Sequence, residues 1–188
     1  AAGACHLEFA DDIRTLRNAG IAVVFASGND GPGPGTSNSP GNYPGAVSVG
    51  AVDRGLVVLR QASRGPSACD AEVFPRLVAP GSNVRTTDLS HGAVRSYTQA
   101  SGTSLAAPHV VGALALLAAA FPSASVAELE AALVQTARDL GEPGPDNAYG
   151  HGLVDAKAAF DRLAGAGKAV QSIGGRTNDG KSTARLMQ

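Results

Sequence analysis

The chain has 188 residues, of which 44% are hydrophobic and 16% charged, enough for one packed core. The net charge of −1 implies no general affinity for nucleic acid. The apolar run 110–120 is too short to cross a bilayer and predicts a core helix instead. We therefore expect neither a nucleic-acid partner nor a membrane partner.

The first elements along the chain are predicted to be a helix and several strands. Residues 6–18 are expected to be helical because Phe9, Ile13 and Leu16 share one face, and Gly20 then ends the helix. The continuous β-branched run 21–26 predicts a buried strand of a parallel sheet. A Gly- and Pro-rich loop follows at 31–43, and further strands are expected at 46–52, 56–59 and 76–79.

The later elements are predicted to be mainly helical. After an alternating strand at 94–99, helices are expected at 104–120, 126–137 and 155–163. Ser123 or Ser125 caps the second of these helices, and Glu128 completes a capping box if Ser125 is the cap. Alternating strands and helices indicate an α/β sandwich with a mainly parallel sheet.

The composition changes near residue 166. Few core residues occur over 166–188, which predicts a flexible tail. The alternative is a short strand at 170–173 that docks on the domain.

The octapeptide 102–109, Gly-Thr-Ser-Leu-Ala-Ala-Pro-His, stands where the long apolar helix begins. The first amides of a helix lack acceptors and the helix dipole is positive there, so an oxyanion beside Ser104 would be stabilised. The alternative is that Ser104 and Thr103 only cap the helix.

A second polar motif follows the strand predicted at 21–26. Asn29 comes after Ser27 and Gly28, at the carboxyl end of a parallel strand, where α/β proteins place their sites. Its side-chain NH₂ group can donate to an oxyanion. The alternative is an ordinary turn asparagine beside glycine.

These two motifs, in this order, resemble those of the subtilisin-like serine proteases, the subtilases. Segments 42–53, 62–66, 78–81 and 149–156 extend the resemblance over residues 7–163. It implies a three-layer α/β sandwich that is incomplete on its N-terminal side, with residues 1–165 as the C-terminal portion of a catalytic domain. It also implies that Ser104 is the nucleophile, that Asn29 forms the oxyanion hole and that His109 is structural.

The resemblance further implies a substrate pocket. Asn38 would lie near its base, where many subtilases have glycine, so we expect a smaller or polar substrate side chain. The other expected pocket residues are Phe25, Ala26, Ser27, Gly28 and Thr103.

The resemblance implies no required cofactor. Subtilases often carry Ca²⁺, and the backbone carbonyls of Gly41, Tyr43 and Ala46 are candidate ligands. The expected partners are a peptide or protein substrate and the missing half of the domain.

A base to deprotonate the Ser104 hydroxyl is not evident, although a serine nucleophile needs one. The family's Asp-(Thr or Ser)-Gly and His-Gly-Thr motifs do not occur, and none of His6, His91, His109 and His151 stands in the base motif. We expect the base, its Asp and one side of the cleft to lie in a missing N-terminal half. The chain alone is then expected to be inactive as a peptidase.

Three explanations of the missing half stay open. The chain is a recombinant fragment, a piece of a protease cut within its domain, or a degenerate relative. A degenerate site has no chemical reason to keep both Ser104 and Asn29, which argues against the last. Two other functions are alternatives to a peptidase. One is a non-catalytic peptide-binding module. The other is an α/β-hydrolase, which needs Gly-x-Ser-x-Gly, and Ala106 breaks that pattern.

The state of the two cysteines depends on whether the protein is cytosolic or secreted. Cys5 and Cys69 are free if the protein is cytosolic, whereas they pair if the parent protease is secreted, as the resemblance implies. A Cys5–Cys69 disulfide would tie the opening segment to the loop before Val78.

Overall fold

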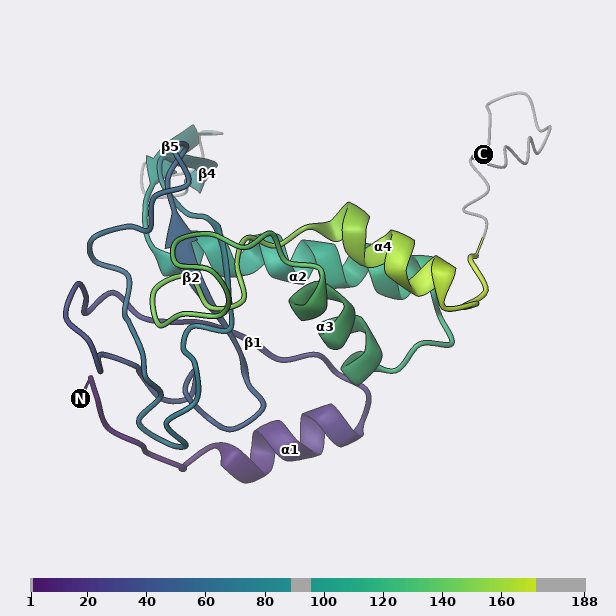
Figure 1. Ribbon diagram of the computed structural model, residues 1–188, viewed down its shortest axis with the longest axis horizontal. Coiled ribbons are helices and arrows are strands. Elements are labelled where there is room, and N and C mark those ends of the chain that lie inside the picture. Colours follow the sequence, from purple (N-terminus) through teal and green to yellow (C-terminus); the bar gives the residue numbers. More distant parts are fainter. Residues whose placement is uncertain (1, 89–95, 172–188) are drawn as a thin grey trace.

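The central sheet has three parallel strands. The computed structural model describes residues 2–88 and 96–171. Strands β1 (Val24–Ala26), β2 (Val47–Val52) and β3 (Leu77–Pro80) lie in the order β1-β2-β3 (Figure 1). Val24 is paired with Val47, and Val49 is paired with Leu77. All six residues of β2 are buried, as expected for the central strand of a covered parallel sheet.

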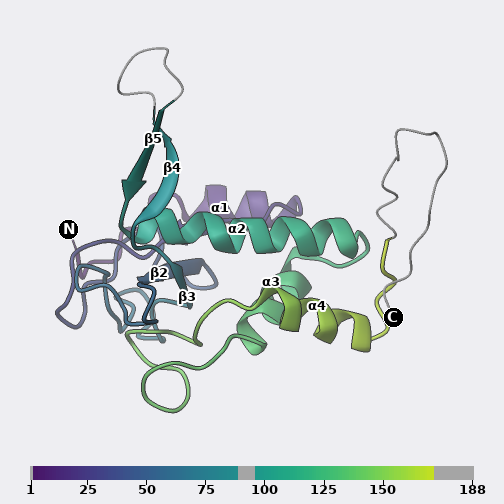
Figure 2. The same ribbon diagram turned by 90° about the horizontal axis from the view of Figure 1, so that it is seen from above.

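Three helices cover one side of this sheet. The long helix α2 (Thr103–Ala120) packs on all three strands, and α3 (Val126–Gln135) and α4 (Ala156–Gly165) pack on α2 and on each other (Figure 2). The main core lies between the sheet and these helices. Its largest fully buried side chains include Leu77, Val110, Leu117, Phe121 and Leu133. Burying each such side chain contributes about 1.5–3 kcal/mol.

A second, smaller core lies under α1 (Ala10–Asn18). Its buried members are Ile13, Tyr43 and Ala46, with Phe25 packed against them, whereas Val24 packs in the main core. Successive strand residues point to opposite faces, so both faces of β1 are covered within the described chain. This confirms the predicted α/β sandwich with a mainly parallel sheet.

Three predicted elements differ from the observed ones for identifiable reasons. Helix α1 begins only at Ala10, because the residues before it are hydrogen-bonded to the loop around Ser39 and Tyr43. Strand β1 begins only at Val24, because its partner β2 starts opposite that residue. The strand expected at 56–59 is reduced to one isolated antiparallel bridge between Val58 and Val52, after a turn in which Asp53 accepts from the N–H groups of Gly55 and Val57.

An antiparallel ribbon stands apart from the sheet. Strands β4 (Val84–Asp88) and β5 (Ser96–Ala100) pair and project from the body of the molecule (Figure 2). The Arg85 guanidinium lies 4.5 Å from the centre of the Tyr97 ring, a cation–π contact across the two strands. The sequence predicted the second strand of this ribbon but not the first. His91 lies outside the described residues.

The remaining helical predictions are close to the structure. Ser125 caps α3 and forms the expected capping box with Glu128, although α3 ends two residues before the expected end. Residues 166–171 lie against the helices: Gln171 N–H donates to the Ala120 carbonyl, and the Lys168 ammonium is 2.6 Å from Glu128. The flexible tail predicted over 166–188 therefore does not begin at 166. The rest of that tail, and residues 172–173 of the alternative strand at 170–173, lie outside the described residues.

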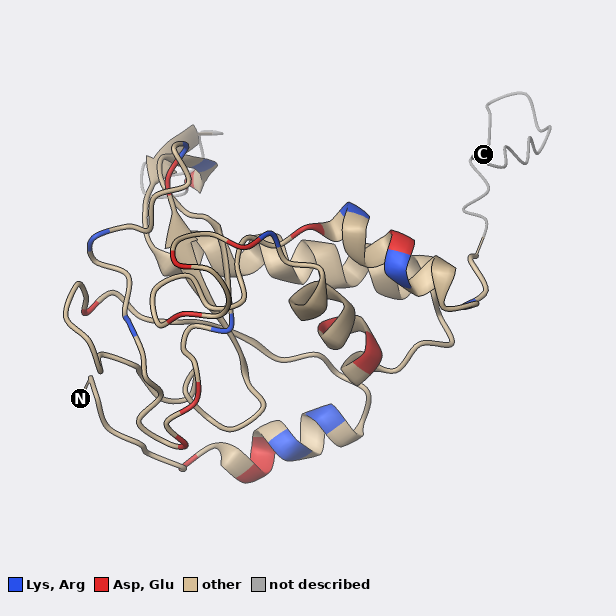
Figure 3. Cartoon of the chain, viewed as in Figure 1, with Lys and Arg blue, Asp and Glu red and all other residues tan. Residues whose placement is uncertain are grey.

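Helix α2 is unusually apolar for a helix with so much exposed surface. It carries no Asp, Glu, Lys or Arg over its 18 residues (Figure 3). Its length and composition would allow it to cross a membrane, but the same is true of core helices, and the sheet and α3 already cover one side of it. Leu116 is 67% exposed and Val111 is 49% exposed on the uncovered side.

Candidate active site

The two hydroxyl residues of the octapeptide lie inside the first turn of α2, not at its cap. The N-cap is Gly102, so Thr103 and Ser104 are the first two helical residues, and the reading of them as capping residues is wrong. Ser104 is exposed, and Thr103 is buried. As the second residue of the helix, Ser104 has a backbone N–H group with no acceptor within the helix. The exposed hydroxyl therefore lies beside a free amide at the positive end of the helix dipole.

The Asn29 carboxamide is bound to the start of α2. Its Oδ1 accepts from the backbone N–H of Thr103 at 3.1 Å, and the Thr103 hydroxyl lies 3.2 Å from both Asn29 Oδ1 and the Gly28 carbonyl. A backbone N–H only donates, so the oxygen of the carboxamide must face α2. The NH₂ group of Asn29 is then turned away from Thr103. Asn29 is exposed, and within the described part of the chain its NH₂ group donates no hydrogen bond.

The sheet holds both parts of this site in place. The residue after β1, Ser27, donates from its N–H to the Val49 carbonyl. At the end of β3, the Gly81 carbonyl accepts from Gly102 N–H at 2.8 Å. A Cβ on Gly81 would lie 2.8 Å from the Gly102 oxygen, so only glycine permits this approach. The carboxyl ends of two parallel strands therefore meet the N-terminus of α2, as expected for a site in an α/β protein.

No histidine that the structure describes is hydrogen-bonded to Ser104. His109 Nδ1 lies 3.0 Å from the Leu105 carbonyl on the same helix, which is a local structural contact. His6 lies in the opening segment. His151 lies in the turn before α4, where burial lowers its pKa and the nearby Arg76 charge adds to the effect. Among the described residues, the site thus holds an exposed hydroxyl and N–H groups beside it, with no histidine bonded to that hydroxyl.

Asn38 fills the space beneath Gly28. A Cβ on Gly28 would lie only 2.2 Å from Asn38 Nδ2. The same NH₂ group donates to Asp30 at 2.7 Å and to the Ser63 hydroxyl at 3.3 Å. The sequence singled out Asn38 but gave no role to Asp30 or Ser63. Asp30 directly follows Asn29, and Ser63 lies in the segment 62–66 that resembles the subtilases. Nothing in the spacing of these residues links them to position 38.

The other expected pocket residues differ in exposure. Phe25, Ala26 and Gly28 are half-buried at the end of β1. Ser27 is fully buried, and its hydroxyl has no hydrogen-bond partner among residues 2–88 and 96–171. The side chain of Ser27 is therefore not on the surface where a substrate would lie.

The candidate calcium ligands share a pocket with a positive charge. Gly41, Tyr43 and Ala46 line a pocket of about 240 Å³ together with Asp70, Glu72 and Arg76, among others. The Arg76 guanidinium offsets only part of the negative charge of the two carboxylates. No cluster of three or more His, Cys, Asp and Glu side chains suited to a metal occurs among the residues described. No step of the reaction is assigned to a Ca²⁺ ion.

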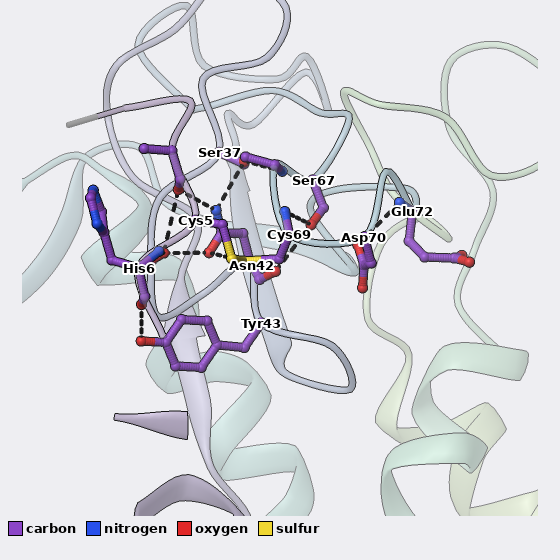
Figure 4. The surroundings of a disulfide bond; sticks show 12 residues. Cys5, His6, Ser37, Asn42, Tyr43, Ser67, Cys69, Asp70 and Glu72 are labelled. Carbon is purple, nitrogen blue, oxygen red and sulfur yellow. Dashed lines mark hydrogen bonds between the residues drawn. A yellow bond between two sulfur atoms is a disulfide. The ribbon is translucent and has the colours of Figure 1, made fainter. Parts of the chain in front are cut away.

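The two cysteines form the expected disulfide. Cys5 and Cys69 are bonded, with their Cα atoms 4.9 Å apart (Figure 4). Bonds of this kind persist mainly in oxidising compartments.

Comparison with known proteins agrees with this geometry. The chain matches the Subtilase family over residues 6–152. It is 37% identical to subtilisin DY of Bacillus licheniformis over 143 residues, which are 74% of this chain and 47% of the relative. It is 37% identical to subtilisin Savinase of Lederbergia lenta over 147 residues, 78% of this chain and 49% of the relative.

A larger relative gives the same result. Bacillopeptidase F of Bacillus subtilis (strain 168) is 36% identical over 175 residues, 88% of this chain and 12% of the relative. The chain thus spans about half the length of the subtilisins it matches and a smaller part of Bacillopeptidase F. With a serine at a helix N-terminus, an asparagine carboxamide bound beside it and this match over most of its length, the chain belongs to the subtilase family.

Proposed function

We propose that this chain supplies the nucleophile and the oxyanion hole of a serine endopeptidase. Membership of the subtilase family supports serine protease function. The observation that carries the proposal is the bond from Thr103 N–H to Asn29 Oδ1, which fixes the carboxamide beside Ser104 with its NH₂ group free.

The reaction is acyl transfer from a peptide to water. The Ser104 oxygen attacks the peptide carbonyl as a base takes its proton, and the carbonyl oxygen becomes an oxyanion. The NH₂ group of Asn29 and the N–H of Ser104 donate to that oxyanion, and both are in place before the charge develops. The amine then leaves with a proton from the base, and water releases the acyl group from Ser104.

The base and its Asp are supplied from a segment outside this chain. The uncovered side of α2 supports this, because a helix that is apolar all round is normally buried all round. Leu116 and Val111 are exposed there, and Pro108 and Gly112 line an apolar depression on the same helix. An N-terminal part of the catalytic domain that covered this surface would bring a histidine to the neighbouring N-terminus of α2. The chain alone is then inactive as a peptidase.

The pocket beneath Gly28 takes a small or polar substrate side chain. Asn38 and its hydrogen-bonded partners occupy the space that a long apolar side chain would need. The protein acts outside the cell, as the disulfide suggests.

The test compares the 188-residue chain with the longer protein that contains it. The longer protein should hydrolyse peptide substrates and react at Ser104 with a fluorophosphonate, and Ser104→Ala should abolish both. Asn29→Ala should lower kcat by about 10²–10³, the effect known for loss of this donor in a subtilisin. Peptidase activity of the 188-residue chain that Ser104→Ala removes would show that the base lies within it. Peptide binding without turnover, unchanged by Ser104→Ala, would instead indicate a non-catalytic binding module.

A further inference from the structure

The opening segment of the chain is tied to the loop that carries Asn38. We call residues 3–9 the opening segment and residues 36–43 the pocket loop. Gly3 N–H donates to the Ser37 carbonyl at 2.9 Å, and His6 N–H donates to the Ser39 hydroxyl at 2.9 Å. The Tyr43 hydroxyl donates to the His6 carbonyl and lies 3.3 Å from Phe9 N. The two segments are more than 30 residues apart in sequence but run together along the whole pocket loop.

A third segment holds the pocket loop from another side. In the turn 67–72, the Ser67 hydroxyl donates to the Asn42 carbonyl at 3.0 Å, and Ala68 N–H donates to the Ser37 hydroxyl at 2.9 Å. The pocket loop is therefore hydrogen-bonded to the opening segment and to the turn at once.

Asn42 contacts all three segments. Its Nδ2 donates to the Ala4 carbonyl at 3.0 Å, and its Oδ1 accepts from the Ser39 hydroxyl at 2.8 Å. The same Oδ1 lies 3.5 Å from Cys69 Sγ, a contact only, because a disulfide sulfur has no proton to donate. Asn42 is 2% exposed, so losing these hydrogen bonds would leave buried polar groups unpaired.

The disulfide joins the two outer segments. Cys5 lies in the opening segment and Cys69 in the turn, so the bond closes around the pocket loop with Asn42 beside it (Figure 4). The opening segment cannot move away from the turn, and the pocket loop can leave them only by breaking its hydrogen bonds to both.

The clamped loop ends at the substrate pocket. Asn42 N–H donates to the Asn38 carbonyl at 3.0 Å, which fixes the backbone of Asn38. The side chain of Asn38 then lies against Gly28 and hydrogen-bonds Asp30. A shift of the pocket loop would therefore move the base of the pocket while leaving Ser104 and Asn29 on the sheet and α2.

We propose that the Cys5–Cys69 disulfide and Asn42 form a clamp that positions Asn38 at the base of the substrate pocket. This inference rests on the proposed function for the meaning of the pocket. The clamp sets how tightly a substrate side chain is held, and it does not take part in bond cleavage. Asn42 and the disulfide are thus positioning elements.

The first experiment measures the clamp without catalysis. Hydrogen exchange is followed in the wild-type chain, in the Cys5→Ser/Cys69→Ser double variant and in Ser39→Ala, which keeps the disulfide if the double variant fails to fold. Amides of the pocket loop should exchange about tenfold faster or more in both variants, while Gly81 N–H, bonded to the Val52 carbonyl, keeps its rate. Ser125→Ala, which weakens the cap of α3 far from the loop, is the control for a general loss of stability and should leave the pocket loop unaffected.

The second experiment uses the longer, active protein. Both variants should raise KM for the preferred peptide severalfold and leave kcat within about twofold, because Ser104 and Asn29 keep their places. A small dithiol reduces Cys5 and Cys69 to thiols and itself becomes a cyclic disulfide. This reduction should raise KM as much as the Cys5→Ser/Cys69→Ser substitution does. Unchanged exchange in the pocket loop overturns the clamp, and so does a fall in kcat at constant KM. If Ser104→Ala leaves hydrolysis intact, the proposed function fails, and the exchange pattern alone then decides whether the clamp holds Asn38.

Discussion

The ion pair between α1 and α3 gives a sharp test of how α1 is held. Arg17 donates two hydrogen bonds to Glu130, at 2.9 and 2.6 Å. The Glu130 side chain is 8% exposed and the Arg17 side chain 27%. Helix α1 has one buried residue, Ile13, so the Arg17–Glu130 pair is one of the few contacts that hold α1 against the rest of the protein.

Arg17→Met should therefore be costly. Removing one partner of a buried pair typically costs about 3–5 kcal/mol, whereas an exposed pair contributes about 0–1 kcal/mol. Because water still reaches Arg17, we expect a loss of about 2–3 kcal/mol in the free energy of unfolding. Arg17→Met/Glu130→Met should lose less than Arg17→Met alone, since no buried charge is left unpaired.

Urea unfolding of Arg17→Met, of Glu130→Met and of the double variant gives the coupling energy between the two side chains. Arg14→Met is the matched control, because Arg14 pairs with Asp11 on the same helix with both side chains more than 70% exposed. It should cost less than about 0.5 kcal/mol. A loss below about 1 kcal/mol for Arg17→Met, or strictly additive single effects, would refute the reasoning.

Further substitutions test the pocket and two titrating groups. Gly28→Ala should cost about 2 kcal/mol or more in urea unfolding, because φ is +105° and the new Cβ would meet Asn38. Ser27→Ala should be neutral or stabilise by about 1 kcal/mol, since it removes a buried hydroxyl without a partner, and clear destabilisation would contradict this. The hydrogen bond from Lys168 lowers the pKa of the Glu128 carboxyl group from 4.5 to about 2. The contribution of Glu128 to the free energy of unfolding is therefore complete above pH 4.5 and is lost as the pH falls towards 2. Glu128→Gln should remove this part of the dependence of stability on pH. Burial lowers the pKa of His151 below 6.5, so stability should fall as the pH drops below 6.5, and a His151→Gln variant with the same slope would disprove that origin.

Elements with strong local signals were predictable from the sequence. The spacing of Ser125 and Glu128 predicted the cap of α3, and the segment 46–52 was expected to be a strand and contains the central strand β2. The elements that were wrong depend on distant partners. Residues 21–23 have strand-forming side chains but lie before the start of the parallel strand β2, and nothing local in the sequence reveals where β2 begins.

The candidate site divides in the same way. Ser104 and Asn29 stand in motifs of fixed local form, and their relative position follows from the helix and strand ends that carry them. Asp30 and Ser63, by contrast, meet Asn38 only because three separate turns come together. A hydrogen bond between turns has no periodicity, so the sequence could not have predicted it.

The bond from α2 to Asn29 has a consequence for how the chemistry is divided along the polypeptide. In the reaction that we propose, the groups that stabilise the oxyanion are held by one sheet and one helix of this chain, independently of the base that takes the proton. Oxyanion stabilisation and proton transfer are thus carried out by separate parts of the polypeptide. An acyl donor with a good leaving group would not need a proton on that group, but the Ser104 hydroxyl would still need a base to take its proton.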